Sequence, residues 1–481
     1  MKKNSKIKLL IVLSITILSS YFLINFTIGD DRFKNLKSFL DNNQKEFIKK
    51  YVFPYKLISQ QEENISQQKE NTSQQEEIVA KQKIKLDLLY SYLPNLEVDF
   101  IKSGSDIKIS KSIIELSNKR TLEKYKLISG FYYGISNQFP GSGYIDFYEN
   151  DIFILSSRGV LAHKKNLTDV NVNFKQIKNN INNFIGINEF NKYNWFSLKD
   201  ILIFKDKIYI SYTEEIEKNC WNTSIIYGDI NYKNIYFKKL FSPKNCVHPD
   251  NIDKEFIAGQ SGGRIVAFNE NHILLSVGEY RSRYLAQDKK SINGKIIKIN
   301  IDNNKHQIIS MGHRNPQGLY FDKENNFVLE TEHGPYGGDE INLIKVEEIN
   351  GDRIQNFGWA ISSAGEHYGG RVDKNKRKYE KYPLYKSHIK HGFIEPLKSF
   401  VPSIAISEIV KIGKNKYVVS SMGYEREGDK SLYFFELNNQ KKIINLEQVK
   451  VFERIRDLRF KDSKLYLFME DTASIGVIHL N

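Results

Sequence analysis

The chain has 481 residues, of which 40% are hydrophobic and 27% are charged, a balance that is ordinary for a globular protein with a large core. The formal net charge is +14, but the excess of lysine accompanies heavy use of isoleucine and asparagine along the whole chain. No tight block of Lys and Arg is interleaved with aromatic residues, so the composition argues against a nucleic-acid-binding protein.

The amino terminus predicts a membrane helix. Four lysines among the first eight residues precede an apolar run from Leu9 to about Ile28, and about 20 such residues span a bilayer as a helix. Because lysines stay on the cytoplasmic side, we expect the rest of the chain on the periplasmic or other extracytoplasmic side. A cleaved signal peptide is the alternative, but the run is long for one and no A-x-A-like site follows it. We therefore predict that residues 1–29 are a cytoplasmic start and a transmembrane signal-anchor.

Residues 30–95 are polar and rich in Gln, Glu and Lys. Within them a seven-residue repeat occurs three times, at residues 59–65, 66–72 and 73–79. Its second heptad position is polar where a coiled coil needs an apolar residue, so a stable coiled coil is disfavoured. We expect a solvated helical stalk or a loose linker that holds the following domain away from the membrane.

From residue 100 to residue 481 a strand–turn–strand unit recurs six times. The copies lie at residues 145–155, 201–211, 265–275, 319–329, 409–419 and 458–467. The longer gap after the fourth copy predicts an insertion around residues 350–400. Each hairpin with two further short strands would make a four-stranded blade, and repeats of this length are typical of β-propellers. We therefore predict an all-β, six-bladed β-propeller, because a pair of β-sandwiches would not produce six similar hairpins.

The chain contains two cysteines, Cys220 and Cys246. In an exported protein a single pair favours one disulfide, which would stabilise the fold by roughly 3 kcal/mol if the geometry permits. Two unrelated free thiols are the alternative.

Two dense polar clusters flank the fourth hairpin. The first cluster precedes the hairpin at residues 312–318 and reads Gly-His-Arg-Asn-Pro-Gln-Gly. The second follows the hairpin at residues 332–342 and reads Glu-His-Gly-Pro-Tyr-Gly-Gly-Asp-Glu-Ile-Asn. The loops of several blades converge at the central channel of a propeller. We therefore expect both clusters to face the same channel mouth and to form a functional site.

These motifs resemble the soluble-type quinoprotein glucose/sorbosone dehydrogenases, which depend on pyrroloquinoline quinone (PQQ), over roughly residues 140–480. The resemblance extends to Asn-Phe-Gly-Trp at 356–359 and Arg-Ile-Arg-Asp at 454–457, with weaker support from 262–265 and 277–279. It implies a six-bladed propeller that oxidises a small-molecule sugar, an aldose, by hydride transfer from a hydroxyl to the quinone. It also implies a respiratory electron acceptor, which the sequence does not identify.

The resemblance further implies a set of residues that contact the quinone. They are Arg314, Asn315, Gln317, His333, Arg454 and Arg456. A cofactor with three carboxylates needs planar, permanently charged guanidinium partners, which fits the arginines. The alternative for the arginines is that they form surface ion pairs.

In the family a calcium ion accompanies the quinone. Gly334 and Pro335 would offer it backbone carbonyls, the kind of oxygen ligand that a hard cation accepts. Asp339 and Glu340 would support this loop or bind a second ion. The plain alternative is that the Gly-Pro-Tyr-Gly-Gly segment only makes a turn.

One position departs from the family. Its catalytic base is a histidine four residues before the Arg of the Gly-Gly-Arg segment, and this chain has Gln260 there. An amide cannot accept the proton of a sugar hydroxyl at neutral pH, and general-base catalysis is typically worth about 10²–10⁴-fold. Another group or water would have to take the proton, and His313, His333 and Glu332 are the residues we consider.

Two hypotheses follow. The first is a membrane-anchored PQQ-dependent sugar dehydrogenase. The second is a catalytically reduced propeller that binds a sugar, a glycan or a protein partner and keeps the old site as a scaffold. Gln260 is the residue that separates them.

Overall fold

The computed structural model describes residues 42, 75–85, 88, 95–132, 141–193, 195–348, 354–369, 375–423 and 430–480. The chain divides into two compact units, Met1–Leu88 and Leu89–Asn481. In the first unit residues 75–85 are helical, and Ile78, Val79 and Ile84 are exposed on this helix.

Among the described residues, no helix is both long enough and apolar enough to cross a membrane. The apolar run that predicts the membrane helix, residues 9–28, lies outside the described residues, as does most of the predicted stalk. The anchor and the boundaries of the stalk therefore stay predictions.

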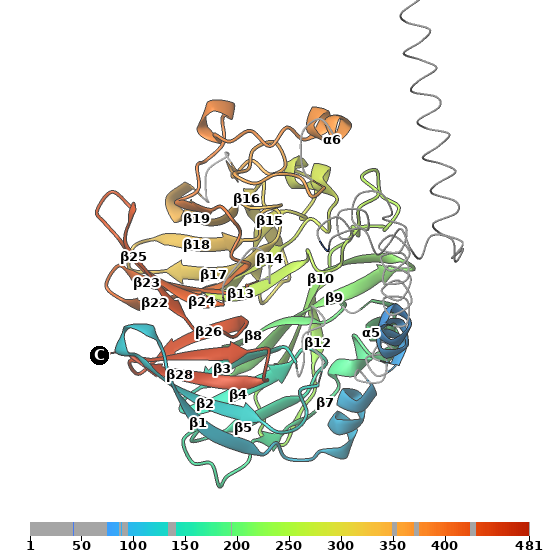
Figure 1. Ribbon diagram of the computed structural model, residues 1–481, viewed down its shortest axis with the longest axis vertical. Coiled ribbons are helices and arrows are strands. Elements are labelled where there is room, and N and C mark those ends of the chain that lie inside the picture. Colours follow the sequence, from blue (N-terminus) through green and yellow to red (C-terminus); the bar gives the residue numbers. More distant parts are fainter. Residues whose placement is uncertain are drawn as a thin grey trace, which may run out of the picture. The chain divides into compact units, whose positions relative to one another are not determined.

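The second unit is built from six antiparallel sheets (Figure 1). Blade one contains β3 (Gly143–Tyr148), β4 (Asp151–Ser156), β5 (Leu161–Lys164) and β6 (Lys175–Gln176). Blade two contains β8 (Leu198–Phe204), β9 (Lys207–Glu217), β10 (Cys220–Asp229) and β12 (Lys238–Phe241). Blade three contains β13 (Gly262–Asn269), β14 (His272–Val277), β15 (Lys295–Asn300), β16 (His306–Met311) and β20 (Gln355–Asn356).

The remaining three blades complete the circle. Blade four contains β17 (Pro316–Asp322), β18 (Phe327–Glu332), β19 (Asp339–Lys345) and β21 (Lys398–Phe400). Blade five contains β22 (Ile406–Gly413), β23 (Lys416–Ser421), β24 (Ser431–Leu437) and β25 (Ile443–Lys450). Blade six contains β26 (Ile455–Lys461), β27 (Lys464–Met469), β28 (Ser474–His479), β2 (Thr121–Leu127) and β1 (Ile109–Glu115).

The inner strands of the blades form a closed ring. Strands β3, β8, β13, β17, β22 and β26 each pack against the next, and β26 packs against β3. Hydrogen bonds also close the ring in blade six, where β2 pairs with β28, so that strands from the two ends of the unit share one sheet (blue-green beside red in Figure 1). The prediction of an all-β, six-bladed propeller is confirmed.

Each predicted hairpin is the inner pair of strands of one blade. These strands are apolar on both faces because each sheet packs against a neighbouring blade on either side. In one such core, Phe153 and Leu155 of β4 pack with Ile201 of β8 and Ile210 of β9. The buried layers between blades hold the inner strands, and hence the residues at their ends, in fixed positions.

The longer gap after the fourth hairpin holds edge strands and short helices. Its elements are η6 (Val346–Glu348), β20, α6 (Lys376–Lys381), η7 (Ile389–His391) and β21. Outside the gap lie η3 (Ser117–Lys119), η4 (Ile181–Asn183), α5 (Ile187–Lys192), η5 (Arg283–Gln287) and the paired strands β7 (Lys178–Asn179) and β11 (Asn234–Ile235). The described helices in this unit are all short, so the sheets form its core.

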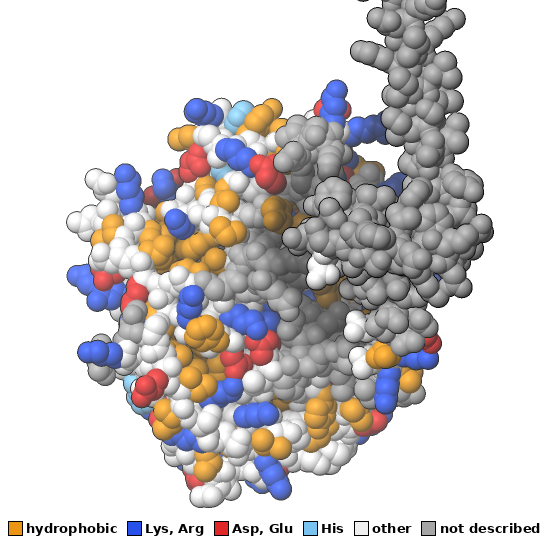
Figure 2. Space-filling view, in the orientation of Figure 1, with side chains coloured by type: hydrophobic (Ala, Val, Ile, Leu, Met, Phe, Trp, Pro, Cys, Tyr) orange, Lys and Arg blue, Asp and Glu red, His pale blue; other side chains and the backbone are white. Residues whose placement is uncertain are grey.

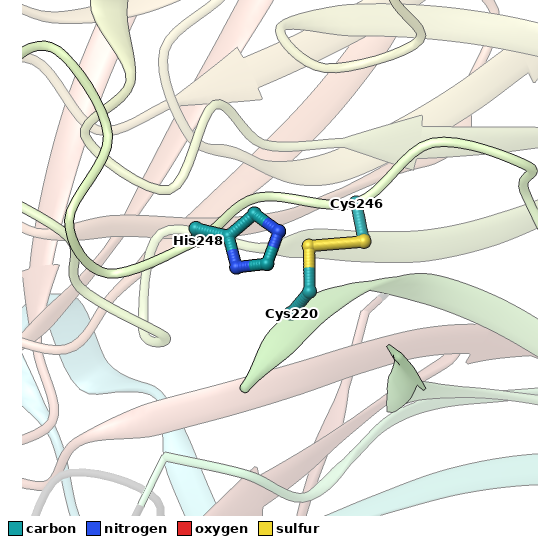
Figure 3. A group of neighbouring side chains, drawn as sticks. All are labelled: Cys220, Cys246 and His248. Atoms are coloured by element: carbon teal, nitrogen blue, oxygen red, sulfur yellow. A yellow bond between two sulfur atoms is a disulfide. The ribbon is translucent and has the colours of Figure 1, made fainter. Parts of the chain in front are cut away.

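The structure contains the disulfide that the sequence predicts. Cys220 at the start of β10 is bonded to Cys246, with 5.3 Å between the two Cα atoms. His248 lies beside the bridge (Figure 3), and the three side chains resemble a metal-ligand set. Because the two sulfurs are bonded to each other, neither is a thiolate that could bind a metal.

The charge is dispersed over the surface. In Figure 2 the Lys and Arg side chains of the described residues are scattered among acidic, polar and apolar groups and form no continuous basic patch on this face.

Candidate functional site

A cavity of about 730 Å³ lies where the inner strands begin. Every inner strand contributes to it near its first residue: Tyr144, Lys199, Gly262, Gln317, Ala405 and Arg456. The cavity therefore sits on the propeller axis, at the mouth that the N-terminal ends of the six inner strands surround.

The cavity gathers nearly all the residues that the sequence predicts for the site. Lining it are Gln260, Arg314, Asn315, Gln317, His333, Gly334, Pro335, Asp339, Arg454 and Arg456. The two polar clusters and the Arg-Ile-Arg segment are separated by more than a hundred residues along the chain, yet they share this one mouth. The roles of these residues in binding a cofactor stay predictions.

The lining is strongly cationic. Among the described residues, five arginines and Lys199 line the cavity, and Asp339 is the one carboxylate that does. The arginines are Arg264, Arg281, Arg314, Arg454 and Arg456. A cavity of this charge suits an anionic ligand.

Arg454 and Arg456 are held by one buried carboxylate. Glu470, the first residue after β27, accepts hydrogen bonds from Arg454 Nε at 3.1 Å and Arg456 Nε at 2.6 Å. Burial alone would raise the pKa of Glu470, but the two guanidinium groups hold it at about 2. The arginines are thus buried ion pairs, not surface ones, and their orientation is fixed from behind by a carboxylate that stays ionised.

Arg314 is held from two sides on the opposite wall. Its Nη1 donates to the carbonyl of His333 at 2.8 Å, and its backbone N–H donates to Glu332. The guanidinium also stacks over Trp359 and Tyr368, at 5.4 Å and 5.8 Å from the ring centroids. Its position is therefore set by the loop of residues 332–334 and by two aromatic rings.

Gln260 is tied into this wall. With its oxygen facing the guanidinium groups, it accepts from Arg314 Nη2 at 2.7 Å and from Arg281 Nε at 3.1 Å, and its nitrogen donates to Glu279 at 2.7 Å. Burial raises the pKa of Glu279 to about 7, against the opposing effect of Arg314. The amide at this position is a structural bridge between two arginines and a buried glutamate.

The Gly-Pro loop is more than a simple turn. The Asp339 carboxylate accepts from the backbone N–H groups of Gly334, Ile404 and Ile406, each at 3.0 Å. A Cβ on Gly334 would lie 2.0 Å from the carbonyl oxygen of Gly338, so only glycine permits this close approach. Asp339 therefore supports the loop, one of the two roles that the sequence suggested for it.

Glu340 lies elsewhere. Its side chain faces Asn342 at 3.4 Å and His388 at 3.6 Å, and it does not line the cavity. The reason is the alternation of side chains along β19, which turns Asp339 and Glu340 to opposite faces of the sheet.

The sequence suggested His313, His333 and Glu332 as alternative acceptors of the sugar proton. His333 lines the cavity, while His313 and Glu332 are buried and are not part of the lining. Burial lowers the pKa of His333 to about 4, with Arg314 and Arg456 acting in the same direction. Its imidazole is neutral at pH 7, but a weak base.

Lys199 was missed in the sequence. It is buried in the cavity wall, donates to the carbonyl of Trp195 at 2.7 Å, and packs so closely on Gly263 that a Cβ there would lie 2.3 Å from the Lys199 Cβ. Burial, and then the charges of Arg456 and Arg158, hold the pKa of Lys199 well below its usual value. It lies next to the segment that carries Gln260.

Arg281, Glu279 and Glu470 also escaped sequence reasoning. Glu279 is the last residue of the Val-Gly-Glu segment, which gave only weak support for a site, and Arg281 follows two residues later. Glu470 directly follows the ordinary strand β27. A charged residue directly after an apolar strand is the one signal that could have pointed to Glu470.

Residues 198–477 match the Glucose / Sorbosone dehydrogenase family, a span that exceeds half of the chain. The chain belongs to this family. It is 25% identical over 290 residues to the aldose sugar dehydrogenase YliI of Escherichia coli, covering 56% of this chain and 71% of that protein. It is 36% identical over 84 residues to quinoprotein glucose dehydrogenase B of Acinetobacter calcoaceticus, 15% of this chain and 16% of that protein.

The fold is shared with solved members. The structure of the soluble aldose sugar dehydrogenase of Escherichia coli in its apo-form superposes with a TM-score of 0.54 at 20% identity, covering 70% of this chain and 95% of that one. At this identity the likeness concerns the propeller architecture and not the details of the site.

Proposed function

We propose that this chain is a membrane-anchored, PQQ-dependent dehydrogenase of aldose sugars. The observation that carries the proposal is the cavity on the propeller axis, where five arginines and Lys199 meet one carboxylate. Family membership supports an oxidoreductase that acts on a sugar, and the relatives it matches are named an aldose sugar dehydrogenase and a quinoprotein glucose dehydrogenase.

The residues fit a tricarboxylate cofactor. Arg454, Arg456 and Arg314 would bind its carboxylates, since each is already held from behind and loses little freedom on binding. Asn315 and Gln317 add amide groups at the same mouth. When bound, the quinone would supply the two-electron acceptor that the amino acids lack.

The calcium site of the family also has suitable residues. Gly334 and Pro335 line the cavity, and among the described residues neither carbonyl accepts a hydrogen bond. These two oxygens would hold a calcium ion, and Asp339 would keep them in place through the N–H of Gly334.

Lys199 is the residue to which we assign the sugar proton. Gln260 is unable to take it, and its amide is already used by Arg281, Arg314 and Glu279. Lys199 lines the cavity beside this segment, and burial lowers its pKa well below the usual value. His333 also lines the cavity, but its pKa of about 4 makes it a weak base.

A catalytically reduced propeller that binds a sugar, a glycan or a protein is the second candidate. Its support is Gln260, which stands where the family has its histidine. A quinone bound without turnover is the result that this candidate predicts.

Turnover separates the two candidates. The protein with calcium and the quinone is expected to reduce an electron-acceptor dye when offered a panel of aldoses. Failure to bind the quinone would contradict the proposal. Binding without turnover in the wild type, restored by Gln260→His, would favour the second candidate.

A further inference from the structure

A buried cluster of acidic groups lies behind the cavity wall, in blade four. Glu330 and Glu332 of β18 meet His313, which precedes β17, and one side-chain oxygen or nitrogen from each lies within 4.8 Å of the others. All three side chains are buried: His313 and Glu330 are fully inaccessible and Glu332 is 3% exposed. None of them lines the cavity.

One ring nitrogen of His313 has a hydrogen-bond partner, and the other points into the cluster. Nε2 is hydrogen-bonded to Ser310 Oγ at 2.8 Å, and the ring stacks on Phe357 with 5.0 Å between centroids. Nδ1 makes no hydrogen bond to any described residue, and neither does Glu330 Oε1. A buried nitrogen left without a partner is costly unless something unseen binds it.

The distances suit a metal ion. His313 Nδ1 lies 3.5 Å from Glu332 Oε1 and 3.7 Å from Glu330 Oε2. Zinc and similar ions bind nitrogen and carboxylate oxygen at about 2.0–2.2 Å, which places neighbouring ligand atoms about 3.0–3.5 Å apart. The three atoms thus surround a point that such an ion would occupy after a small contraction.

A bound cation would relieve the mutual repulsion of the carboxyl groups gathered here. Glu340 brings a third carboxylate, and Asn342 Nδ2 donates to Glu330 at 3.0 Å, to Glu332 at 3.2 Å and to Glu340 at 3.4 Å. Among the described residues, no Lys or Arg side chain forms an ion pair with any of the three glutamates. A divalent ion would balance two carboxylates directly.

We propose that His313, Glu330 and Glu332 bind a structural divalent metal ion of the first transition row, such as Mn²⁺ or Zn²⁺. The mixed nitrogen and oxygen ligands favour these ions over calcium. Ser310 and Asn342 orient the ligands, as partners behind metal ligands commonly do. Through Glu332, which accepts from the backbone N–H of Arg314, the ion would stiffen the wall that carries Arg314.

The test uses the full chain without the quinone, stripped with a chelator and titrated with MnCl₂ or ZnCl₂. We expect a single tight site and a rise in Tm on reloading. His313→Gln keeps a hydrogen-bonding group toward Ser310 but removes Nδ1, and Glu330→Gln removes a charge at constant shape. Each is expected to weaken Mn²⁺ binding about 100-fold or more, beyond the 10–100-fold typical of losing an orienting partner.

His367→Gln is the matched control. His367 is also buried, has Nε2 bonded to the carbonyl of Tyr382 at 2.8 Å, and has Nδ1 without a hydrogen bond to a described residue, but it belongs to no candidate ligand set. This variant should bind Mn²⁺ as the wild type does. Equal binding in wild type and both cluster variants would overturn the proposal.

A spectroscopic measurement keeps the proposal testable if the variants do not fold. Mn²⁺ bound to the wild type should show electron spin-echo modulation from a directly bound ¹⁴N nucleus, because His313 supplies the one nitrogen ligand. A bound ion without this modulation, or a stripped wild type that neither binds Mn²⁺ or Zn²⁺ nor changes its Tm, would overturn the proposal.

Discussion

The cavity has two arginine walls, and the buried carboxyl groups behind them have pKa values shifted in opposite directions. Behind Arg454 and Arg456 stands Glu470, whose pKa is held at about 2, so it is ionised at any working pH. Behind Gln260 and Arg314 stands Glu279, whose pKa burial raises to about 7. We propose that the first wall holds an anion, while in the second wall the Gln260 amide bridges two arginines and Glu279.

In this account, the side chains that bind an anion are distinct from the group that takes the sugar proton. A wall whose charges are fixed from behind can be kept unchanged while the group that moves the proton changes. Lys199, in the neighbouring blade two, is the amine to which we assign the sugar proton.

The largest effect is expected on breaking the first wall. Glu470→Gln leaves Arg454 and Arg456 buried without their shared partner, and breaking a buried pair in this way costs about 3–5 kcal/mol of unfolding free energy. Denaturant unfolding measures it. Asp229→Asn, which removes the exposed pair between Lys207 and Asp229, should cost less than about 1 kcal/mol. Equal effects of the two variants would contradict the account.

The two walls should also respond to pH with opposite signs. Both glutamates start from a pKa of 4.5. Because the folded pKa of Glu279 is higher, its contribution falls as pH rises from 4.5 to about 7, by about 3 kcal/mol at most. Because the folded pKa of Glu470 is lower, its contribution is present above pH 4.5 and is lost as pH falls toward 2.

Glu279→Gln isolates the first of these slopes. Unfolding free energies measured between pH 4.5 and 7 should decline less in this variant than in the wild type, by up to about 3 kcal/mol. A decline that is unchanged would mean that Glu279 does not take up a proton on folding.

The proton-transfer assignment is tested by Lys199→Met, which keeps the stem and removes the amine. We expect kcat to fall about 100-fold, the lower end of general-base contributions, and the pH dependence of kcat to lose the limb that reports a base. Quinone affinity should change little. A variant that keeps the wild-type pH profile would point to water or His333 as the acceptor.

A smaller effect is expected at the Gly-Pro loop. Asp339→Asn replaces a carboxylate that accepts three backbone N–H groups, and a hydrogen bond to a charged group contributes about 1.5–3 kcal/mol. We expect the loss of about 2 kcal/mol of stability and weaker calcium affinity, measured by calorimetry. Unaltered calcium affinity would show that Asp339 does not influence calcium binding.

Much of this architecture could be predicted because its signals are local. Apolar strands joined by short polar turns mark each inner hairpin, and the Arg and Gly residues of the site stand in compact motifs beside them. Blade six is the exception. Strands β1 and β2 mix Lys, Ser, Thr and Glu with apolar residues, and β28, the partner of β2, lies some 350 residues away in sequence, so no local pattern shows the closure.

The rest of the site could not be predicted because its properties arise only when the blades converge. Lys199 follows an apolar residue at the start of β8, and nothing beside it in the sequence shows that Arg456 lies nearby. Glu279 and Glu470 acquire their opposite pKa shifts from burial and from arginines of other segments. The sequence places Glu340 beside Asp339, and only the pleat of β19 separates them.

The measurement that tests the central claim most directly is equilibrium binding of pyrroloquinoline quinone, in the presence of calcium, to the wild type and to Arg456→Gln. The account predicts binding by the wild type and an affinity about 10–100-fold lower in the variant, since one charge-assisted contact contributes about 1.5–3 kcal/mol. A wild type that does not bind the quinone, or a variant that binds it equally well, would contradict the account.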